Sequence, residues 1–354
     1  MQKFLVIQTA FIGDVVLATG LIEKLHAYFP DARIDFLVRK GNEALLAGHP
    51  FLNQVLVWNK KENKLGNLWR LLRIIRKVKY DKVINVQRFA ATGLLTAFSG
   101  ARETIGFDKN PLSRFFSKRV PHIVSYDPSH TKGSGPGNSN ITGSNSNLIP
   151  AHEIDRNQTL IQSFTDPVPA KPRLYPSQQD YEKVREYKTA TPYITVSPAS
   201  VWFTKQYPKD KWISFLKNLP GKYTVYLLGA PSDQPLTEDI IAGAGARPSL
   251  ISLSGRLSFL QSAALMKDAV MNYVNDSAPM HFASSVNAPV TAIYCSTIPA
   301  FGFGPLSDLK YIVEVKEPLE CRPCGLHGYK TCPLGHFRCA YGIEEQQLLA
   351  SLPV

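Results

Sequence analysis

The sequence lacks any uninterrupted apolar run of about 18 residues, the length that a transmembrane helix needs. An apolar stretch begins near the first residue, but Gln8, Gly13 and Asp14 interrupt it, and no small-residue cleavage site follows. We therefore expect neither a signal peptide nor a membrane-spanning helix, and we predict a protein that is made and kept in the cytosol.

Acidic residues are in the minority, because 28 Asp and Glu stand against 40 Lys and Arg, a formal net charge of +12. Such an excess favours an anionic partner: nucleotide phosphates, a phosphorylated glycolipid, an acidic membrane surface or a nucleic acid. The basic residues are dispersed, and no zinc-finger, RNP-type or helix-turn-helix pattern is evident. We expect no nucleic-acid partner.

The G-x-G-x-x-G fingerprint of dinucleotide-binding proteins is also missing. Even so, 354 residues with 44% hydrophobic content suffice for about two domains. Apolar runs of β type alternate with segments of helical periodicity, which predicts parallel sheets covered by helices on both faces. The first series has expected strands at 3–8, 33–39, 54–59 and 82–87 and expected helices at 15–30, 42–48 and 67–79.

The same alternation returns between Tyr193 and Cys295, after a Pro-rich stretch at 166–177 that indicates a linker. We predict two doubly wound, Rossmann-like α/β domains that face a central cleft. The Gly/Ser/Asn-rich segment 129–149 is expected to be a mobile loop, either a surface insertion or a lid beside an active site. The predicted parts are residues 1–170, residues 178–320 and a Cys-containing tail at 321–354.

Asp14 follows the first expected strand and stands at the start of the next helix. A carboxylate there accepts hydrogen bonds from free backbone N–H groups and interacts favourably with the helix dipole, so Asp14 can simply cap the helix. It also lies at the carboxyl end of a strand, where open α/β sheets bind ligands, so it can act as a general base. The sequence is compatible with both roles.

The loop after the strand at Tyr193 is rich in groups that bind phosphate oxygens, although a merely solvated Lys205 is the alternative. After the following strand, Gly229 would let the backbone approach a nucleotide closely, and Asp233 could accept from ribose or base. Such turns are common in α/β proteins. The candidate donor-binding groups of the first loop are Ser197, Ser200, Thr204 and Lys205.

The segment VNDSAPMHFASS is the strongest local signal. Asp276 and Ser277 end a strand, and Ala278 opens a helix whose free N–H groups and dipole favour an anion. Asp276 can bind hydroxyl groups and His281 can contact phosphate, whereas a packed core histidine is the alternative for His281.

Four of the five cysteines lie in CRPCGLHGYKTCPLGHFRC, residues 321–339. One pair has the C-x2-C spacing, but the other gaps do not form the second close pair of a zinc ribbon. Reduced, packed thiols are therefore favoured over a structural metal site.

Four collinear segments resemble motifs of the heptosyltransferases of lipopolysaccharide core assembly, glycosyltransferase family 9. They are FIGDVVLATGLIEKL, SPASVWFTKQYP, NDSAPMHFAS and CPLGHFRC, and together they cover both halves of the chain. The resemblance implies the two-Rossmann-domain GT-B fold, an inverting reaction without metal or cofactor, and ADP-activated L-glycero-D-manno-heptose as donor.

By the same resemblance, Asp14 is the catalytic base and Lys205 contacts the donor diphosphate. Asp276 holds the donor sugar, and Ser277, Ala278 and His281 surround the phosphates. The family commonly has Thr-Gly where this chain has Ser277-Ala278, and often Glu near the position of Asp233. These departures concern base and sugar specificity and leave the predicted fold unchanged.

The resemblance thus predicts heptose transfer to a lipopolysaccharide core or lipid A-type glycolipid at the cytoplasmic face of the inner membrane. Asp14 would remove the acceptor proton, and Lys205 with the helix start near Ser277 would stabilise the departing diphosphate. Two alternatives remain: a transferase that uses a GDP- or UDP-sugar, and a non-catalytic nucleotide- or glycan-binding protein on the same fold. Asp14 and Lys205 together argue against the second.

The expected helix at 67–79 has basic residues around an apolar stripe. It can be an ordinary covering helix with its stripe on the sheet. Alternatively, the packed helix uses its basic face for peripheral contact with anionic lipid, at about 1 kcal/mol per Lys or Arg. The stripe is Leu68, Leu71, Leu72 and Ile75, and the basic residues are Arg70, Arg73, Arg76 and Lys77.

Overall fold

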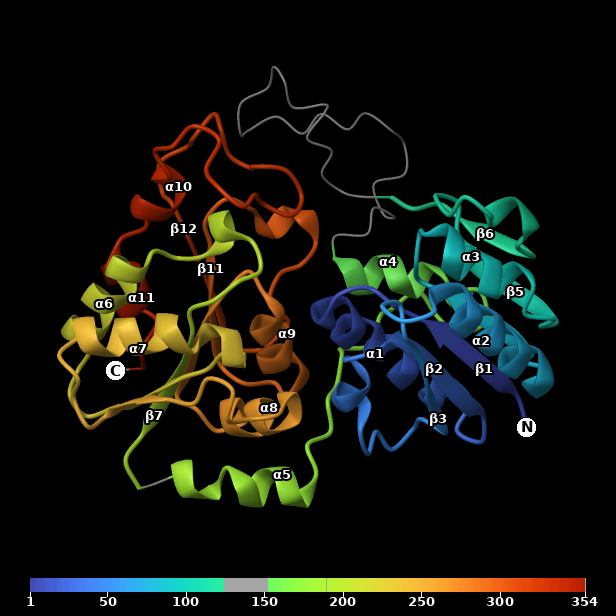
Figure 1. The fold of residues 1–354 in the computed structure, drawn as a ribbon, viewed down its shortest axis with the longest axis horizontal. Coiled ribbons are helices and arrows are strands. Elements are labelled where there is room, and N and C mark those ends of the chain that lie inside the picture. Colours follow the sequence, from blue (N-terminus) through green and yellow to red (C-terminus); the bar gives the residue numbers. More distant parts are fainter. Residues whose placement is uncertain (124–151, 189, 354) are drawn as a thin grey trace. The chain divides into compact units, whose positions relative to one another are not determined.

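The computed structural model describes residues 1–123, 152–188 and 190–353, so the predicted loop at 129–149 lies outside the described residues. The described chain forms two compact units (Figure 1). The first comprises Met1–Ile123 with the described part of Pro150–Tyr175, and the second comprises the described part of Pro176–Val354. Among the described helices, none is long and apolar enough to cross a membrane.

The first unit contains a six-stranded sheet in the order β3-β2-β1-β4-β5-β6, and all its paired strands are parallel. The strand order reverses between β1 and β4, which makes their carboxyl ends the switch point where such sheets bind ligands. The strands are β1 Lys3–Ile7, β2 Arg33–Arg39, β3 Gln54–Trp58, β4 Lys82–Asn85, β5 Glu103–Phe107 and β6 Lys118–Val120. The helices are α1 Ile12–Tyr28, η1 Glu43–Leu46, α2 Lys64–Val78, α3 Ala90–Ala97, η2 Ser113–Phe115 and α4 Glu153–Thr159.

Two helices of this unit bury different amounts of their surface. α1 is buried over most of its length, and a Cβ at Gly20 would lie 2.6 Å from the carbonyl oxygen of Ala170, so Gly20 lets the returning chain cross α1 closely. α2 instead buries only the predicted stripe of Leu68, Leu71, Leu72 and Ile75, in a core shared with Leu5 and Val83 of the sheet. The stripe therefore packs on the sheet, as both alternatives for this helix require.

The second unit repeats the architecture with the strand order β12-β11-β10-β7-β8-β9. Its switch point lies between β7 and β10, which pair in parallel. The strands are β7 Tyr193–Ser197, β8 Thr224–Leu227, β9 Leu250–Ser252, β10 Met271–Asn275, β11 Val290–Tyr294 and β12 Lys310–Glu314. The helices are α5 Gln178–Lys183, η4 Arg185–Tyr187, η5 Phe203–Lys205, α6 Lys209–Asn218, η6 Pro231–Asp233, α7 Gln234–Gly243, α8 Phe259–Lys267, α9 Ala278–Ser285, η7 Pro299–Phe301, α10 Arg338–Tyr341 and α11 Glu345–Leu349.

The Cys-containing tail packs into the second unit. Phe337, Ile343 and Leu348 join the core of its sheet, and the Tyr273 hydroxyl of β10 donates to the Leu348 carbonyl over 3.1 Å. The tail therefore packs against the sheet at β10, which is one of the two strands at the switch point.

Candidate functional site

The loop that carries Lys205 is fixed by one asparagine at the second switch point. Asn275, the last residue of β10, is fully buried. Its Oδ1 accepts from the Tyr207 backbone N–H over 2.9 Å, and its Nδ2 donates to the Pro198 carbonyl over 2.7 Å. Because these two contacts lie near the two ends of loop 198–207, Asn275 sets the position of the whole loop.

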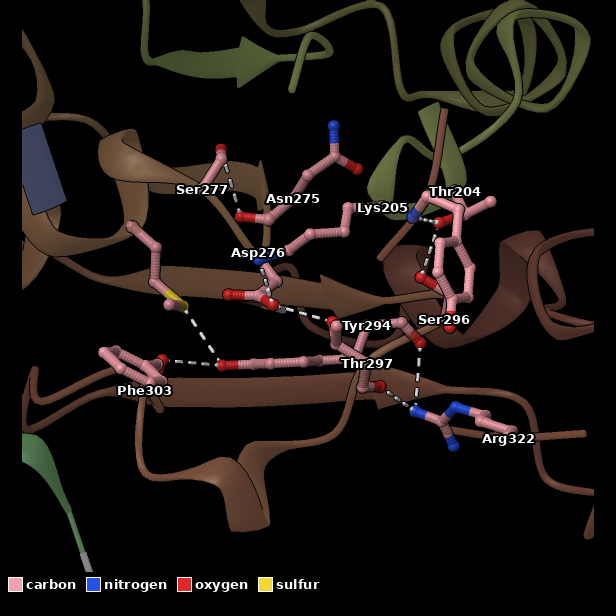
Figure 2. A network of polar contacts seen from close by, with 12 residues as sticks. Thr204, Lys205, Asn275, Asp276, Ser277, Tyr294, Ser296, Thr297, Phe303 and Arg322 are labelled. Carbon is pink, nitrogen blue, oxygen red and sulfur yellow. Dashed lines mark hydrogen bonds and ion pairs between the residues drawn. The ribbon is translucent and has the colours of Figure 1, made fainter. Parts of the chain in front are cut away.

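Lys205 forms an ion pair with Asp276, the residue directly after β10 (Figure 2). Lys205 Nζ lies 2.6 Å from Asp276 Oδ2, and the Thr297 hydroxyl donates to the same oxygen over 2.6 Å. The Asp276 side chain is only 8% exposed, so its charge requires these partners. A lysine ammonium has three N–H donors, which leaves Lys205 further capacity toward an anionic ligand.

Thr204 holds the Lys205 loop against the tail. Its hydroxyl accepts from the Ser296 hydroxyl over 3.0 Å and from the Tyr329 N–H over 2.7 Å, and its own N–H donates to the Tyr329 carbonyl over 3.1 Å. Figure 2 shows Thr204 and Ser296 beside Lys205. The Thr204 hydroxyl, which the sequence assigned to the donor, thus makes contacts within the protein that position Lys205.

Arg322, between two cysteines of the tail, fixes the chain that follows β11. Its guanidinium donates to the carbonyl of Thr297 over 2.8 Å (Figure 2). It also donates to the carbonyl of Cys295 over 2.8 Å and to Glu314 Oε2 over 2.6 Å. Sequence reasoning missed Thr297 and Arg322. A weak signal existed, because two hydroxyl residues follow the strand that ends at Tyr294, as polar groups do at ligand-binding strand ends.

A glycine of the tail packs directly against this arrangement. Gly328 has φ of +75°, and a Cβ there would lie 2.8 Å from Thr204 Oγ1 and 3.0 Å from Lys205 Cγ. Gly335 has nearly the same φ, +72°, but open space around it. The two glycines therefore share the left-handed backbone and differ in what a side chain would meet.

We expect Gly328→Ala to lower stability and to weaken nucleoside diphosphate binding, because its methyl group would displace Thr204 and Lys205. Gly335→Ala should cost only the backbone strain, about 1–2 kcal/mol, and leave affinity unchanged. Thermal unfolding and calorimetry of both variants measure the difference. Equal nucleotide affinity in the two variants would show that the contact with Lys205 is unimportant for binding.

The start of α9 lies directly beside the ion pair. Ser277 is its N-cap, Ala278 its first residue, and the Ser277 hydroxyl donates to the Asn275 carbonyl over 3.4 Å. The second residue of α9 is a proline, which has no N–H, so this turn offers an anion the Ala278 N–H and the positive end of the helix dipole. The structure thus brings Lys205, Asp276, Ser277 and Ala278 together. His281 lies on α9 with a buried side chain, so any contact with phosphate would need local rearrangement.

The remaining predicted groups lie at the ends of β7 and β8. Ser197 is buried, and its hydroxyl has no hydrogen-bond partner among the described residues. Ser200 accepts at its carbonyl from Gln206 Nε2 over 2.7 Å. Gly229 is needed for packing, since a Cβ there would lie 2.9 Å from Asp233 Cβ. Asp233 itself caps η6, because its Oδ2 accepts from the Ala230 N–H over 2.8 Å.

Asp14 occupies the third position of α1, at the carboxyl end of β1. Its Oδ2 accepts from the Phe11 N–H over 3.1 Å, so the carboxylate does cap the helix. Burial, and next the negative charge of Glu153, raise the pKa of Asp14 from 3.8 to about 6. A carboxylate with a pKa nearer to neutrality is a stronger base, so the capping group also has the property that a general base requires.

Glu153 is the first residue of α4, which packs on α1. Its side chain is 13% exposed and pairs with Arg156, whose Nη2 lies 2.7 Å from Glu153 Oε2. Burial raises the pKa of Glu153, and Arg156 opposes that change. Glu153 is far from Asp14 along the chain, so its effect on the pKa of Asp14 can be recognised only from the folded structure.

Two cations lie at the same edge of the first sheet. Lys60 Nζ donates to the carbonyl of Thr9 over 2.8 Å, and the Arg39 guanidinium lies 5.1 Å from the centre of the Phe11 ring. Arg39 also lowers the pKa of Asp14, although less than burial raises it. The surroundings of Asp14 are thus partly positive, which suits an anionic ligand.

None of the five cysteines forms a disulfide. Cys295 and Cys339 lie in the core of the second unit, and burial raises the pKa of Cys339 to about 12. Within residues 1–123, 152–188 and 190–353, no three His, Cys, Asp or Glu side chains have an arrangement that could hold a metal ion.

Comparison with known proteins identifies heptosyltransferases among those similar to this chain. Glycosyltransferase family 9 (heptosyltransferase) matches residues 140–331. The curated lipopolysaccharide heptosyltransferase 3 of Escherichia coli is 26% identical over 294 residues, which cover 81% of this chain and 82% of that protein.

Solved structures share the architecture at low sequence identity. The glycosyl transferase family 9 structure from Veillonella parvula has a TM-score of 0.79 at 20% identity and covers 99% of this chain and 96% of that one. The structure of E. coli ADP-heptose lps heptosyltransferase II has a TM-score of 0.75 at 20% identity, and the match covers 99% of this chain and 97% of that one. These likenesses confirm the predicted pair of Rossmann-like domains of GT-B type.

Proposed function

Because this chain belongs to glycosyltransferase family 9, we propose that it transfers heptose from ADP-heptose to a glycolipid of lipopolysaccharide-core type, with inversion at the anomeric carbon. The observation that carries the proposal is the Lys205–Asp276–Thr297 cluster beside the start of α9, which has the donors that a sugar diphosphate requires. The names of two similar E. coli proteins, which include lipopolysaccharide and ADP-heptose, support the donor and the class of acceptor.

In the proposed reaction, Asp14 acts on the acceptor. Its carboxylate takes the proton of an acceptor hydroxyl while that oxygen attacks the anomeric carbon of the heptose. The bond from that carbon to the β-phosphate oxygen breaks, and ADP leaves with the electron pair. A single displacement of this kind inverts the anomeric centre. A pKa of about 6 keeps Asp14 mostly ionised at neutral pH and still makes it a stronger base than an ordinary aspartate.

The second unit supplies the groups for the donor. The Lys205 ammonium, the Ala278 N–H and the positive end of the α9 dipole stabilise the negative charge that develops on the leaving diphosphate. Asp276 keeps lone pairs for a hydroxyl group of the sugar, while Lys205 and Thr297 hold the carboxylate in place. These groups account for stabilisation of the leaving group without a metal ion, and we infer a metal-independent reaction.

We also propose a cytoplasmic location, at the inner face of the membrane that holds the acceptor. A nucleotide sugar made in the cytoplasm and a lipid-linked acceptor meet there. This location follows from the proposed substrates, so evidence against those substrates would also remove the argument for it.

Release of nucleoside diphosphate from a panel of donors tests the proposal. With a core glycolipid acceptor, we expect ADP release from ADP-heptose at a rate that saturating EDTA changes by less than about twofold, because Lys205 and the positive start of α9 stabilise the diphosphate in place of a metal ion. A GDP- or UDP-sugar as the preferred donor would favour the alternative transferase. Rescue by magnesium of an activity that EDTA abolishes would contradict the mechanism, and binding without turnover of any donor would favour a non-catalytic protein.

A further inference from the structure

Helix α2 leaves large apolar side chains exposed on one flank. Leu65 and Trp69 are 67% and 55% exposed, although the opposite side of the helix packs on the sheet. Leu65, Trp69, Arg73 and Arg76 are spaced i, i+4, i+8 and i+11, so they line a single flank of α2. A helix that only covers a sheet gains nothing from a tryptophan on its solvent side.

The flank continues onto two neighbouring segments of the first unit. α3 packs beside α2 (Figure 1), and Arg76 Nη1 donates to the carbonyl of Phe98, at the end of α3, over 3.4 Å. The exposed Phe98 ring lies 6.4 Å from the exposed Phe115 ring, and the Arg114 guanidinium lies 4.7 Å from the centre of the latter. We call this surface the basic-aromatic face: Leu65, Trp69, Arg73, Arg76, Phe98, Arg114 and Phe115.

The charge of the face identifies the chemistry of its partner. α2 contains five basic residues and no acidic one. A second copy of this chain would bring like charges together, which disfavours self-association through this face. Tryptophan and phenylalanine rings prefer the boundary between lipid headgroups and acyl chains, and arginine pairs with the phosphates there. The five basic residues are Lys64, Arg70, Arg73, Arg76 and Lys77.

We propose that the basic-aromatic face docks the protein peripherally and reversibly on a membrane of anionic phospholipid. Trp69, Leu65 and the two phenylalanines enter the headgroup region, and Arg73, Arg76 and Arg114 bind lipid phosphates. The inference rests on the proposed function in one respect, since a lipid-linked acceptor gives such docking its purpose. The sequence pattern of this helix indicated only the basic residues around the apolar stripe. It did not indicate that Leu65 and Trp69 are exposed.

A matched pair of variants tests the face. Trp69→Gln with Arg73→Gln removes one apolar side chain and one charge from it. Arg70→Gln with Ile74→Gln makes the same changes on the other exposed flank of α2. Sedimentation with phosphatidylglycerol-containing vesicles should fall by about tenfold or more for the first variant and by less than about threefold for the second. All four side chains are exposed, so the melting temperatures of parent and variants should agree.

Activity on two acceptors separates this proposal from the proposed function. On the delipidated core oligosaccharide, parent and both variants should have equal rates, whereas on acceptor in anionic vesicles only the first variant should be slow. Equal vesicle binding by the two variants, or binding of the parent to neutral phosphatidylcholine vesicles that equals its binding to anionic ones, would overturn the docking face. Absence of transfer to either acceptor, with vesicle binding intact, would instead contradict the proposed function.

Discussion

Replacing Asp14 by Asn will reduce turnover at saturating substrates by about 10²-fold or more, as expected when a general base is lost. The amide oxygen of Asn can still accept from the Phe11 N–H, so the capping contact and the fold of α1 should persist. Steady-state kinetics measure the loss of turnover, and circular dichroism checks that the fold persists. Donor affinity should not change, because the groups that we assign to the donor all belong to the second unit.

The same substitution should stabilise the fold at neutral pH. Burial raises the pKa of Asp14 from 3.8 to about 6, so the folded state binds this proton more tightly than the unfolded state. Its contribution to stability therefore falls as pH rises through this window and is lowest above pH 6. Asn carries no charge, so we expect a gain of about 1–2 kcal/mol at neutral pH that disappears below about pH 4. A variant that is inactive and less stable would indicate a merely structural role.

The pH dependence of turnover should identify Asp14 independently. The parent rate should fall about tenfold per pH unit below pH 6, where the base becomes protonated. Glu153→Gln removes a neighbouring negative charge, so the pKa of Asp14 and the acid limb of the profile should move to lower pH. Asp31→Asn removes one charge from an exposed loop position and serves as the control, with no displacement expected.

Loss of Lys205 will have the second large effect, on stability and on donor binding together. Lys205→Ala leaves the buried Asp276 carboxylate without its ammonium partner, and breaking a buried pair costs about 3–5 kcal/mol. Because Lys205 keeps slight contact with solvent, we expect a loss at the low end of this range. ADP affinity should fall by about 1.5–3 kcal/mol, the range for hydrogen bonds to charged groups.

A double variant separates the two effects. Lys205→Met with Asp276→Asn removes both charges, so stability should recover while ADP affinity stays low. Lys209→Ala is the matched surface control, since Lys209 pairs with Asp239 over 2.8 Å and both are well exposed. It should change stability by less than about 1 kcal/mol and leave affinity intact. Parent-like ADP affinity in the double variant would show that Lys205 does not contact the diphosphate.

The fold was largely predictable because its strongest elements have one clear pattern. β1 is a continuous apolar run after Lys3, and α2 has a regular buried stripe. Elements without such a pattern were missed. β9 has only three residues, and β12 leaves Lys310, Tyr311 and Ile312 exposed, as an edge strand can, so neither has the apolar run of a central strand.

The candidate site was predictable only where its residues are neighbours in sequence. Asp276, Ser277 and Ala278 form one strand-to-helix turn, a local arrangement that the sequence can indicate. Thr297 and Arg322 act on that turn from other segments, and Glu153 reaches Asp14 only because α4 packs on α1. Such contacts depend on tertiary structure, which no local periodicity encodes.

The mass of the acceptor glycolipid after incubation with ADP-heptose tests the central claim most directly. We predict that the parent protein, in EDTA, adds one heptose unit per acceptor and releases one ADP, and that Asp14→Asn leaves nearly all acceptor unchanged in the same time. Nuclear magnetic resonance of the product should show the anomeric configuration opposite to that of the donor. An acceptor that gains no heptose from ADP-heptose, or that gains it with the configuration of the donor retained, would contradict the account.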